Sequence, residues 1–334
     1  MNMEEIITLD YGSGGKKTSR LIEKMIVPAL SNPALAALGD GAVVEGFEKL
    51  AFSTDSFVID PIFFPGGDIG KLSVCGTVND LAMCGAEPKY LSCSFIIEEG
   101  MPMAELEKIV DSIRSQCEKC GVQVVTGDTK VVEKGRGDKI YINTAGIGFV
   151  KYPGLSPDNI RAGDAVIVSG TVGDHGTAVM LARSGMMQLD LKSDCAALNG
   201  LCEKILSTGA KVRVLRDPTR GGLATTLNEF VENSELSVVV EEELIPVKPQ
   251  VQAACDMLGL DALYCANEGK LICVVAAEDA QKVIAAMRET DEGKDAAVIG
   301  CVSAEYPGKL VMQTRFGGRR VLQKLTGAQL PRIC

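Results

Sequence analysis

Histidine is almost missing from this sequence of 334 residues, which contains only His175. A lone histidine excludes a His-rich zinc site and argues against a Ser-His-Asp triad. Because His175 begins an expected helix, a capping role is favoured over a catalytic one. Cys117 and Cys120 form a Cys-x-x-Cys pair without a second pair or a histidine at ligand spacing, so we interpret them as structural.

Long apolar runs and an excess of positive charge are also missing. No run approaches the ~20 apolar residues that cross a bilayer, and the first ten residues lack the basic start of a secretory signal. The net charge of −10 repels phosphate backbones, and no stretch is both basic and aromatic-rich. We therefore expect no membrane and no nucleic-acid partner. The twelve cysteines are expected to be free thiols in a reducing cytoplasm.

Apolar runs alternate with glycine, proline and aspartate in a pattern typical of two α+β domains. A break at 153–157 separates a domain at 1–152 from one at 153–315. Expected strands are 42–44, 50–53, 90–97, 122–125, 140–150, 165–169, 236–240, 262–265, 271–276 and 297–302. Expected helices are 69–84, 106–117, 175–184, 195–207, 218–233 and 279–289.

The remaining segment, 316–334, is expected to be a mobile tail. Gly317 and Gly318 would form its hinge, and residues 306–334 contain six basic residues and no acidic one. This charge favours docking on an acidic surface. The tail ends at Cys334, whose thiol in a mobile and basic segment indicates a group that is meant to be modified.

Several aspartates follow or adjoin expected strands and helices, where carboxylates that converge on one cleft would suit Mg²⁺ and nucleotide phosphates. The metal candidates are Asp40, Asp55, Asp80 and Asp128. Each aspartate alone could merely cap a turn. Gly12–Lys16 is glycine-rich but lacks the Walker A spacing, so it is a weak phosphate-binding signal. The segment 216–223 places charged residues, Pro218 and two glycines at an expected helix start, where phosphate binding and simple capping are equally plausible.

These motifs together resemble a known family. Ser53–Ser56, Val78–Pro88, Gly127–Lys130, Arg216–Gly222 and Pro331–Cys334 are similar to the HypE family of hydrogenase maturation proteins, the carbamoyl dehydratases. This family belongs to the PurM-like ATP-binding superfamily, with aminoimidazole ribonucleotide synthetase and selenophosphate synthetase. The Asp motifs identify only the superfamily, whereas the Pro-Arg-Ile-Cys ending is specific to HypE.

The resemblance implies a homodimer in which the N-terminal domains of two chains share a β-barrel. It also implies that the carbamoyltransferase HypF loads a carboxamide onto Cys334, that ATP drives its dehydration to a thiocyanate, and that a HypC–HypD iron-scaffold complex receives the cyanide. The implied catalytic residues are Lys130 and Glu268, with Cys334 carrying the substrate group. Glu268 would take a proton while Lys130 neutralises charge, but the sequence leaves open which of them is the base. The implied ATP-binding residues are Lys16, Asp55, Asn79, Asp128 and Asp217.

Two other functions remain open. One is a synthetase or kinase of the same superfamily that acts on a free small molecule, as selenophosphate synthetase does. That enzyme carries a reactive Cys or selenocysteine in its N-terminal glycine-rich loop, where this chain has Ser13. The other is a carrier or metallochaperone without catalytic activity, whose tail cysteine only holds a ligand.

Overall fold

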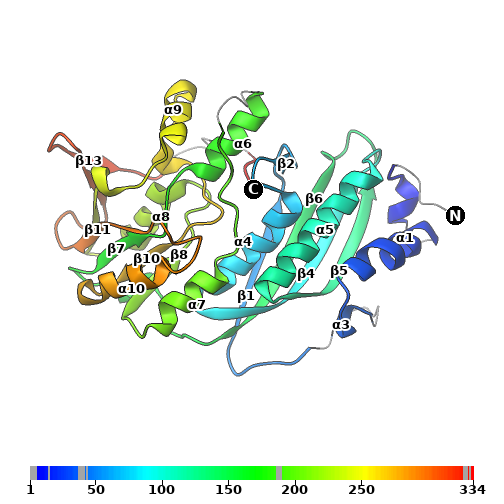
Figure 1. Ribbon diagram of the computed structural model, residues 1–334, viewed down its shortest axis with the longest axis horizontal. Coiled ribbons are helices and arrows are strands. Elements are labelled where there is room, and N and C mark those ends of the chain that lie inside the picture. Colours follow the sequence, from blue (N-terminus) through cyan, green and yellow to red (C-terminus); the bar gives the residue numbers. More distant parts are fainter. Residues whose placement is uncertain are drawn as a thin grey trace.

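Two β-sheets, one in each half of the chain, organise the structure, a computed structural model that describes residues 6–13, 16–36, 42, 44–185, 190–325, 330 and 332–334. Strands β1 (Leu50–Phe57), β4 (Ala86–Glu98), β5 (Gln123–Val132) and β6 (Ile140–Val150) form the first sheet in the order β1-β6-β4-β5. The two domains lie against each other along the longest axis of the molecule (Figure 1). Both are mixed α and β, so the predicted α+β class is confirmed.

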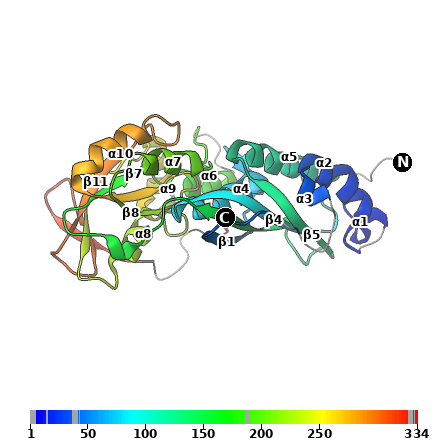
Figure 2. The same ribbon diagram turned by 90° about the horizontal axis from the view of Figure 1, so that it is seen from below.

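Helices α4 (Ile69–Met83) and α5 (Met103–Cys120) cover one face of the first sheet (Figure 2). In α5 the apolar stripe of Leu106, Ile109, Val110 and Ile113, which predicts this helix, is buried, and Gly121 ends the helix with a φ of 70°. That conformation suits glycine because it has no Cβ. Helix α4 is buried on nearly all sides, since it also contacts α7 (Asn199–Ser207) and β8 (Val212–Arg216) of the second domain. Its carboxyl half therefore lies at the boundary between the domains.

The other face of the first sheet carries exposed apolar side chains. Leu50 and Phe52 on β1 and Ile96 on β4 are 48%, 71% and 45% exposed. They alternate along their strands with residues that face α4 and α5.

No helix in the described part of the chain is both long and apolar enough to cross a bilayer.

The second sheet contains seven strands in the order β13-β12-β9-β11-β7-β10-β8. Helices α7 and α10 (Ala280–Met287) pack on one of its faces, and α8 (Gly222–Val231) packs on the other. Helices α6 (Asp174–Ser184) and α9 (Pro249–Leu258) form a smaller cluster beside it. The strands not yet given are β7 (Ala165–Val168), β9 (Ser237–Glu241), β10 (Ile272–Val275), β11 (Ala297–Ser303), β12 (Leu310–Gln313) and β13 (Arg319–Leu322).

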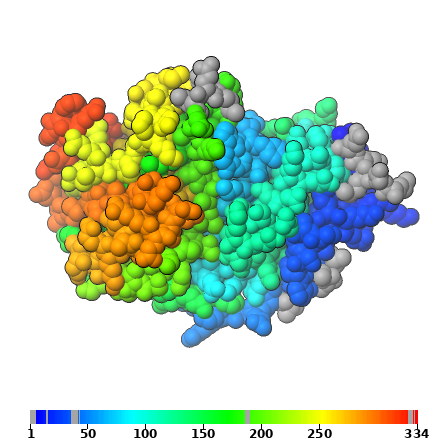
Figure 3. All heavy atoms as spheres, viewed as in Figure 1, coloured from blue at the N-terminus to red at the C-terminus, as the bar shows by residue number. Residues whose placement is uncertain are grey.

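Short elements complete the chain. They are η1 (Leu9–Gly12), α1 (Lys16–Leu21), η2 (Ile22–Ile26), α2 (Val27–Ala29), α3 (Pro33–Ala36), β2 (Phe63–Phe64), β3 (Gly67–Asp68), η3 (Pro157–Asn159), η4 (Glu242–Leu244), η5 (Ala262–Tyr264) and η6 (Ala277–Asp279). The space-filling view shows the N-terminal elements at the edge of the first domain, far from the second (Figure 3).

The structure corrects several expectations. The predicted strand at 262–265 is largely the short helix η5, and Ala42 and Val44 lie outside any strand. Helices α7 and α8 begin at Asn199 and Gly222 rather than at 195 and 218. The predicted hinge at Gly317–Gly318 is instead a tight turn between β12 and β13, closed by a hydrogen bond of 2.8 Å from Thr314 N to Gly318 O. Residues 319–322 thus belong to the second sheet, because their backbone groups pair with β12. The tail leaves this sheet only after Leu322.

Candidate functional site

The tail returns to the boundary between the two domains and lines a pocket of about 190 Å³ there. We call this the tail pocket. The carboxyl end of β1, the middle of α4, the segment between β8 and α8, Glu268 and the tail line it. Its lining residues are Asp55, Ser56, Phe57, Val58, Gly76, Asp80, Asp217, Thr219, Arg220, Glu268, Leu330, Arg332, Ile333 and Cys334. Figure 1 shows the C-terminus at this boundary, beside α4 and β2.

Three aspartates from three separate elements meet in the tail pocket. Ser53 Oγ donates a hydrogen bond of 2.6 Å to Asp80 Oδ2. Burial and the charge of Asp80 raise the pKa of Asp55 to about 6, and the same two causes raise the pKa of Asp217 to about 7. Carboxylates destabilise one another in this way when no cation lies between them. The three carboxyl groups, which all line the tail pocket, are called the acidic cluster below.

Glu268 and Cys334 lie beside this cluster. Glu268 is 3% exposed, and its Oε1 has no hydrogen-bond partner in the described part of the chain. Burial, followed by the neighbouring Cys195 thiol and acidic groups, raises the pKa of Glu268 well above its usual range. Burial and the Glu268 charge raise the pKa of the Cys334 thiol to about 12. The docked thiol is therefore protonated at neutral pH and is a poor nucleophile in this position.

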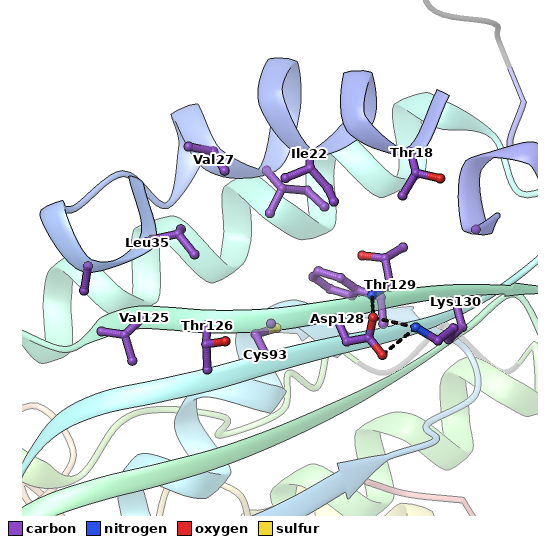
Figure 4. A pocket seen from close by; sticks show the side chains of 15 residues that line it. Thr18, Ile22, Val27, Leu35, Cys93, Val125, Thr126, Asp128, Thr129 and Lys130 are labelled. Atoms are coloured by element: carbon purple, nitrogen blue, oxygen red, sulfur yellow. Dashed lines mark hydrogen bonds and ion pairs between the residues drawn. The ribbon is translucent and has the colours of Figure 1, made fainter. Parts of the chain in front are cut away.

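Lys130 and Asp128, which are predicted to act with Glu268 and Cys334, do not lie in the tail pocket. They line a second pocket, of about 300 Å³, between β5 and the segment that includes Thr18 and Ile22 (Figure 4). Lys130 Nζ lies 2.6 Å from Asp128 Oδ1, and both side chains are more than half exposed. In this chain, Lys130 therefore forms an ion pair and does not line the tail pocket.

The sheet register shows how far apart the two pockets are. Ser56, Asn143, Ser94 and Asp128 are successive partners across β1, β6, β4 and β5. Three strand spacings of about 4.8 Å place Asp128 roughly 14 Å from Ser56 at the tail pocket. Asp55 and Asp80 thus share a pocket with Asp217, while Asp128 does not join them.

The other predicted ligands have different positions. Lys16 is exposed at the start of α1, and Asp40 lies outside the described residues. Asn79 is buried and holds the segment before α7, because its Nδ2 donates to Ala196 O at 3.1 Å and its Oδ1 accepts from Leu198 N at 2.8 Å. The amide of Asn79 therefore connects the two domains beside the acidic cluster.

Sequence reasoning missed the residues that hold the tail. His175 was interpreted as a helix cap, but it is fully buried and contacts Ile333, 158 residues away. Arg183 on the same helix binds the carbonyl oxygen of Arg332 at 2.8 Å. No local pattern connects α6 to the tail, whereas Arg220, at the rim of the pocket, lies within the motif at 216–223.

Replacing Asp217 by asparagine is expected to stabilise the ligand-free protein, and to do so more at pH 8 than at pH 5. The pKa of this carboxyl is raised from 3.8 to about 7, so the folded state holds a proton that the unfolded chain releases. Its contribution to stability is therefore lost as the pH rises from about 4 to about 7. The gain at pH 8 should exceed that at pH 5 by on the order of 1–3 kcal/mol, measured by urea unfolding. Equal gains at both pH values would contradict the raised pKa.

Comparison with known proteins agrees with this architecture. The model of the AIR synthase related protein, N-terminal domain, matches residues 38–150, and that of the C-terminal domain matches residues 161–313. The two domains and the acidic cluster between them define a member of the AIR-synthase-related class.

Closer relatives narrow the class. The chain is 48% identical over 333 residues to a carbamoyl dehydratase HypE of Cupriavidus necator, covering 98% of this chain and 95% of that protein. A crystal structure of HypE in complex with ATP superposes with a TM-score of 0.94 at 49% identity, covering 98% of this chain and 99% of the other. A HypE chain in a HypE–HypF complex superposes with a TM-score of 0.79 at 47% identity, covering 91% and 99% of the two chains. The chain belongs to the carbamoyl dehydratase HypE family.

Proposed function

We propose that this chain uses ATP to dehydrate an S-carboxamide on its own Cys334 to a thiocyanate, which supplies the cyanide ligands of iron in [NiFe]-hydrogenase maturation. The observation that carries the proposal is the position of Cys334, whose side chain lines one pocket with Glu268 and the acidic cluster. The relatives named carbamoyl dehydratase and the ATP complex of one of them support the reaction class.

The reaction removes the carboxamide oxygen and two N–H protons. The amide oxygen attacks the γ-phosphorus of ATP, and ADP leaves as the bond from that phosphorus to the bridging oxygen breaks. The phosphorylated oxygen is a good leaving group, and it departs as inorganic phosphate when the C≡N bond forms. A base must accept the N–H protons within hydrogen-bond distance. Glu268 suits this role once ionised, because burial destabilises its charged form and makes it a stronger base. The carboxamide oxygen ends in phosphate, so the atoms balance with ATP as the only co-reactant.

The high pKa of the docked thiol indicates that the carboxamide is loaded and dehydrated at two different positions of the tail. A thiol with a pKa of about 12 does not attack a carbamoyl donor at neutral pH. We therefore propose that Cys334 receives its carboxamide from HypF when the tail is undocked and undergoes dehydration when it is docked. Mass spectrometry of the tail peptide after incubation with HypF, its carbamoyl donor and ATP tests the function. The expected sequence is a carboxamide adduct followed by the loss of one water, and an adduct that persists with ATP would refute the proposal.

Mg²⁺ would bind with the ATP phosphates at Asp55 and Asp80, adjacent carboxylates of the acidic cluster. No group of three His, Cys, Asp or Glu side chains is arranged around one point in the part of the chain that the structure describes. Two carboxylates suffice when phosphates supply further ligands, which is how Mg²⁺ is usually held. The mutual repulsion of the acidic groups fits this role, since a bound cation would relieve it. Bound Mg²⁺ would neutralise the developing charge on the transferred phosphate.

The second pocket, which lies between β5 and the N-terminal helices and contains Asp128 and Lys130, is proposed as a further part of the nucleotide site. Lys130 would neutralise charge on the ATP phosphates in this pocket, because it does not line the tail pocket where Cys334 lies. Its ammonium is already paired with Asp128, so phosphate would compete with a carboxylate for it. Lys130→Ala should accept the carboxamide but lose most of the ATP-dependent water loss, and a variant that dehydrates at the wild-type rate would exclude this role.

We also propose a homodimer, the HypC–HypD complex as acceptor of the cyanide, and a cytoplasmic location, which twelve cysteines without a disulfide fit. The uncovered sheet face supports the dimer, because Leu50, Phe52 and Ile96 expose apolar surface that a second copy would bury. Phe52→Asp is expected to shift the protein to a monomer in sedimentation at micromolar concentration. Phe316→Asp, on the turn between β12 and β13, is the control because that ring is 87% exposed and far from the sheet face. A wild type that sediments as a monomer would contradict the dimer.

A further inference from the structure

Backbone groups that follow β1 hold the tail from one side. Val58 N donates to Cys334 O at 3.1 Å, and Asp60 N donates to Arg332 O at 3.4 Å. The order of the partners is reversed along the two segments, so the tail runs antiparallel to residues 58–60. Arg332 Nε also donates to Val58 O at 3.0 Å. These contacts leave the carbonyl oxygen of Ile333 facing the opposite side.

Helix α6 holds the tail from that opposite side. His175 Nε2 lies 2.9 Å from Ile333 O, and Arg183 Nη2 lies 2.8 Å from Arg332 O. Arg183 Nε also donates to Asp60 O at 2.9 Å, so one guanidinium joins both segments. Together with the backbone groups of 58–60, these side chains bind three successive carbonyl oxygens of the tail. The recognition is made through the main chain and leaves the Cys334 side chain available for chemistry.

The partners of His175 determine which ring nitrogen carries the proton. Ile333 O can only accept, so Nε2 must donate. The other nitrogen, Nδ1, lies 2.7 Å from Ser193 Oγ, which itself accepts from Cys195 N at 3.0 Å. Burial lowers the pKa of His175 and favours the neutral ring, so with Nε2 protonated Nδ1 accepts the hydroxyl hydrogen of Ser193. This chain of three hydrogen bonds fixes the neutral tautomer of a fully buried ring.

The same turn that orients His175 also positions Glu268. Asp194 Oδ1 accepts from Glu268 N at 3.1 Å, and Ala196 N donates to Glu268 O at 3.1 Å. A Cβ on Gly269 would lie 1.8 Å from Asp194 O, so only glycine allows this approach of the two segments. The imidazole that holds the tail and the backbone that carries the proposed base are thus both fixed to residues 193–196.

We propose that His175 is a positioning residue for the dehydration step: its Nε2–H fixes the Ile333 carbonyl and thereby aligns the group on Cys334 Sγ with the Glu268 carboxylate. The alignment rests on the proposed function, whereas the docking of the tail does not. A misplacement of about 1 Å can cost on the order of 100-fold in rate, so one hydrogen bond at the preceding residue is sufficient to matter.

Two replacements separate the hydrogen bond from the bulk of the ring. His175→Phe keeps a planar ring but removes the donor, whereas His175→Gln retains an N–H near the position of Nε2. In single-turnover assays of the carboxamide-loaded protein with saturating ATP, His175→Phe is expected to lose 10- to 100-fold in the rate of water loss. His175→Gln should recover most of it. Equal rates for the wild type and His175→Phe would overturn the role in alignment.

Alkylation by iodoacetamide tests the docking without ATP or HypF, so its outcome is independent of the proposed function. Cys334 is expected to react at least 10-fold faster in His175→Phe than in the wild type, measured on the tail peptide by mass spectrometry. Cys301, an exposed thiol on β11, provides the reference rate in each protein. A Cys334 rate that stays at the wild-type value while Cys301 is unchanged would overturn the contact.

Arg183→Met provides an independent test if His175→Phe folds poorly. Arg183 lies near the end of α6 and is only partly buried, so its replacement should preserve the fold. It should also accelerate alkylation of Cys334, and unchanged protection would argue against recognition of the tail from α6. Comparing the melting temperature of His175→Phe with that of wild type, each with and without residues 330–334, identifies the cause. The decrease in melting temperature caused by His175→Phe should be smaller when residues 330–334 are removed. An equal decrease with and without these residues would indicate that His175 stabilises only the core.

Discussion

Replacing Glu268 by glutamine is expected to leave the carboxamide on Cys334 and to slow its dehydration by 10²- to 10⁴-fold, as usual for loss of a catalytic base. The amide keeps the size of the side chain but cannot accept the N–H proton. Because the variant also removes a buried acidic group, the protein should be no less stable than the wild type. Single-turnover mass spectrometry of the tail peptide, started with Mg-ATP, measures the rate.

The matched control is Glu278→Gln, the same chemical change at an exposed residue that pairs with Lys211 on the protein surface. It should dehydrate the carboxamide at the wild-type rate. If Glu268→Gln reached within threefold of that rate, the base would have to be another group. A pH profile adds a second criterion: wild-type activity should decline as Glu268 becomes protonated, and the residual activity of the variant should not show this decline.

Replacing Cys334 by alanine is expected to abolish cyanide delivery entirely, because the thiol carries the substrate group and no other side chain in the tail can replace it. Binding of Mg-ATP should persist, since neither Asp55 nor Asp80 depends on the thiol. Transfer of labelled cyanide carbon to the iron acceptor measures the loss, and the thermal shift caused by Mg-ATP measures the binding.

Two results would contradict the proposal that Cys334 carries the substrate group of an ATP-dependent dehydration. Delivery of cyanide by Cys334→Ala would favour an enzyme that acts on a free small molecule, as other members of the superfamily do. Wild-type protein that accepts the carboxamide but consumes no ATP would instead favour a carrier. Cys301→Ala is the control, because it removes an exposed thiol outside the pocket and should leave delivery unchanged.

Much of the fold followed from local sequence. The stripe of Leu106, Ile109, Val110 and Ile113 predicted α5, and all four side chains are buried. The strand at 140–150 was predicted at its observed bounds, because it is enriched in β-branched residues and bounded by turn formers. Such patterns depend on neighbours within a few residues, which is the range at which sequence spacing determines geometry.

The acidic cluster was predicted in part. Asp55, beside an expected strand, and Asp80, within an expected helix, were metal candidates, and the resemblance implied Asp217 as an ATP-binding residue. The structure places all three in one pocket. The register across β1, β6, β4 and β5 excludes Asp128 from this group, since three strand spacings separate it from the tail pocket. Register depends on which strands are neighbours, and sequence spacing does not reveal the order β1-β6-β4-β5.

The course of the tail was decided only by tertiary structure. Its glycines and basic residues predicted a mobile segment, but β13 pairs with β12, and Ile333 is 2% exposed within the core of the first domain. The groups that bind it, Asp60 N, Arg183 and His175, are more than 140 residues away in sequence. The sequence by itself determined the elements and the types of reactive group. Only the packing of two domains determined which groups meet, because main-chain carbonyl oxygens are the same at every residue and carry no signal of their partners.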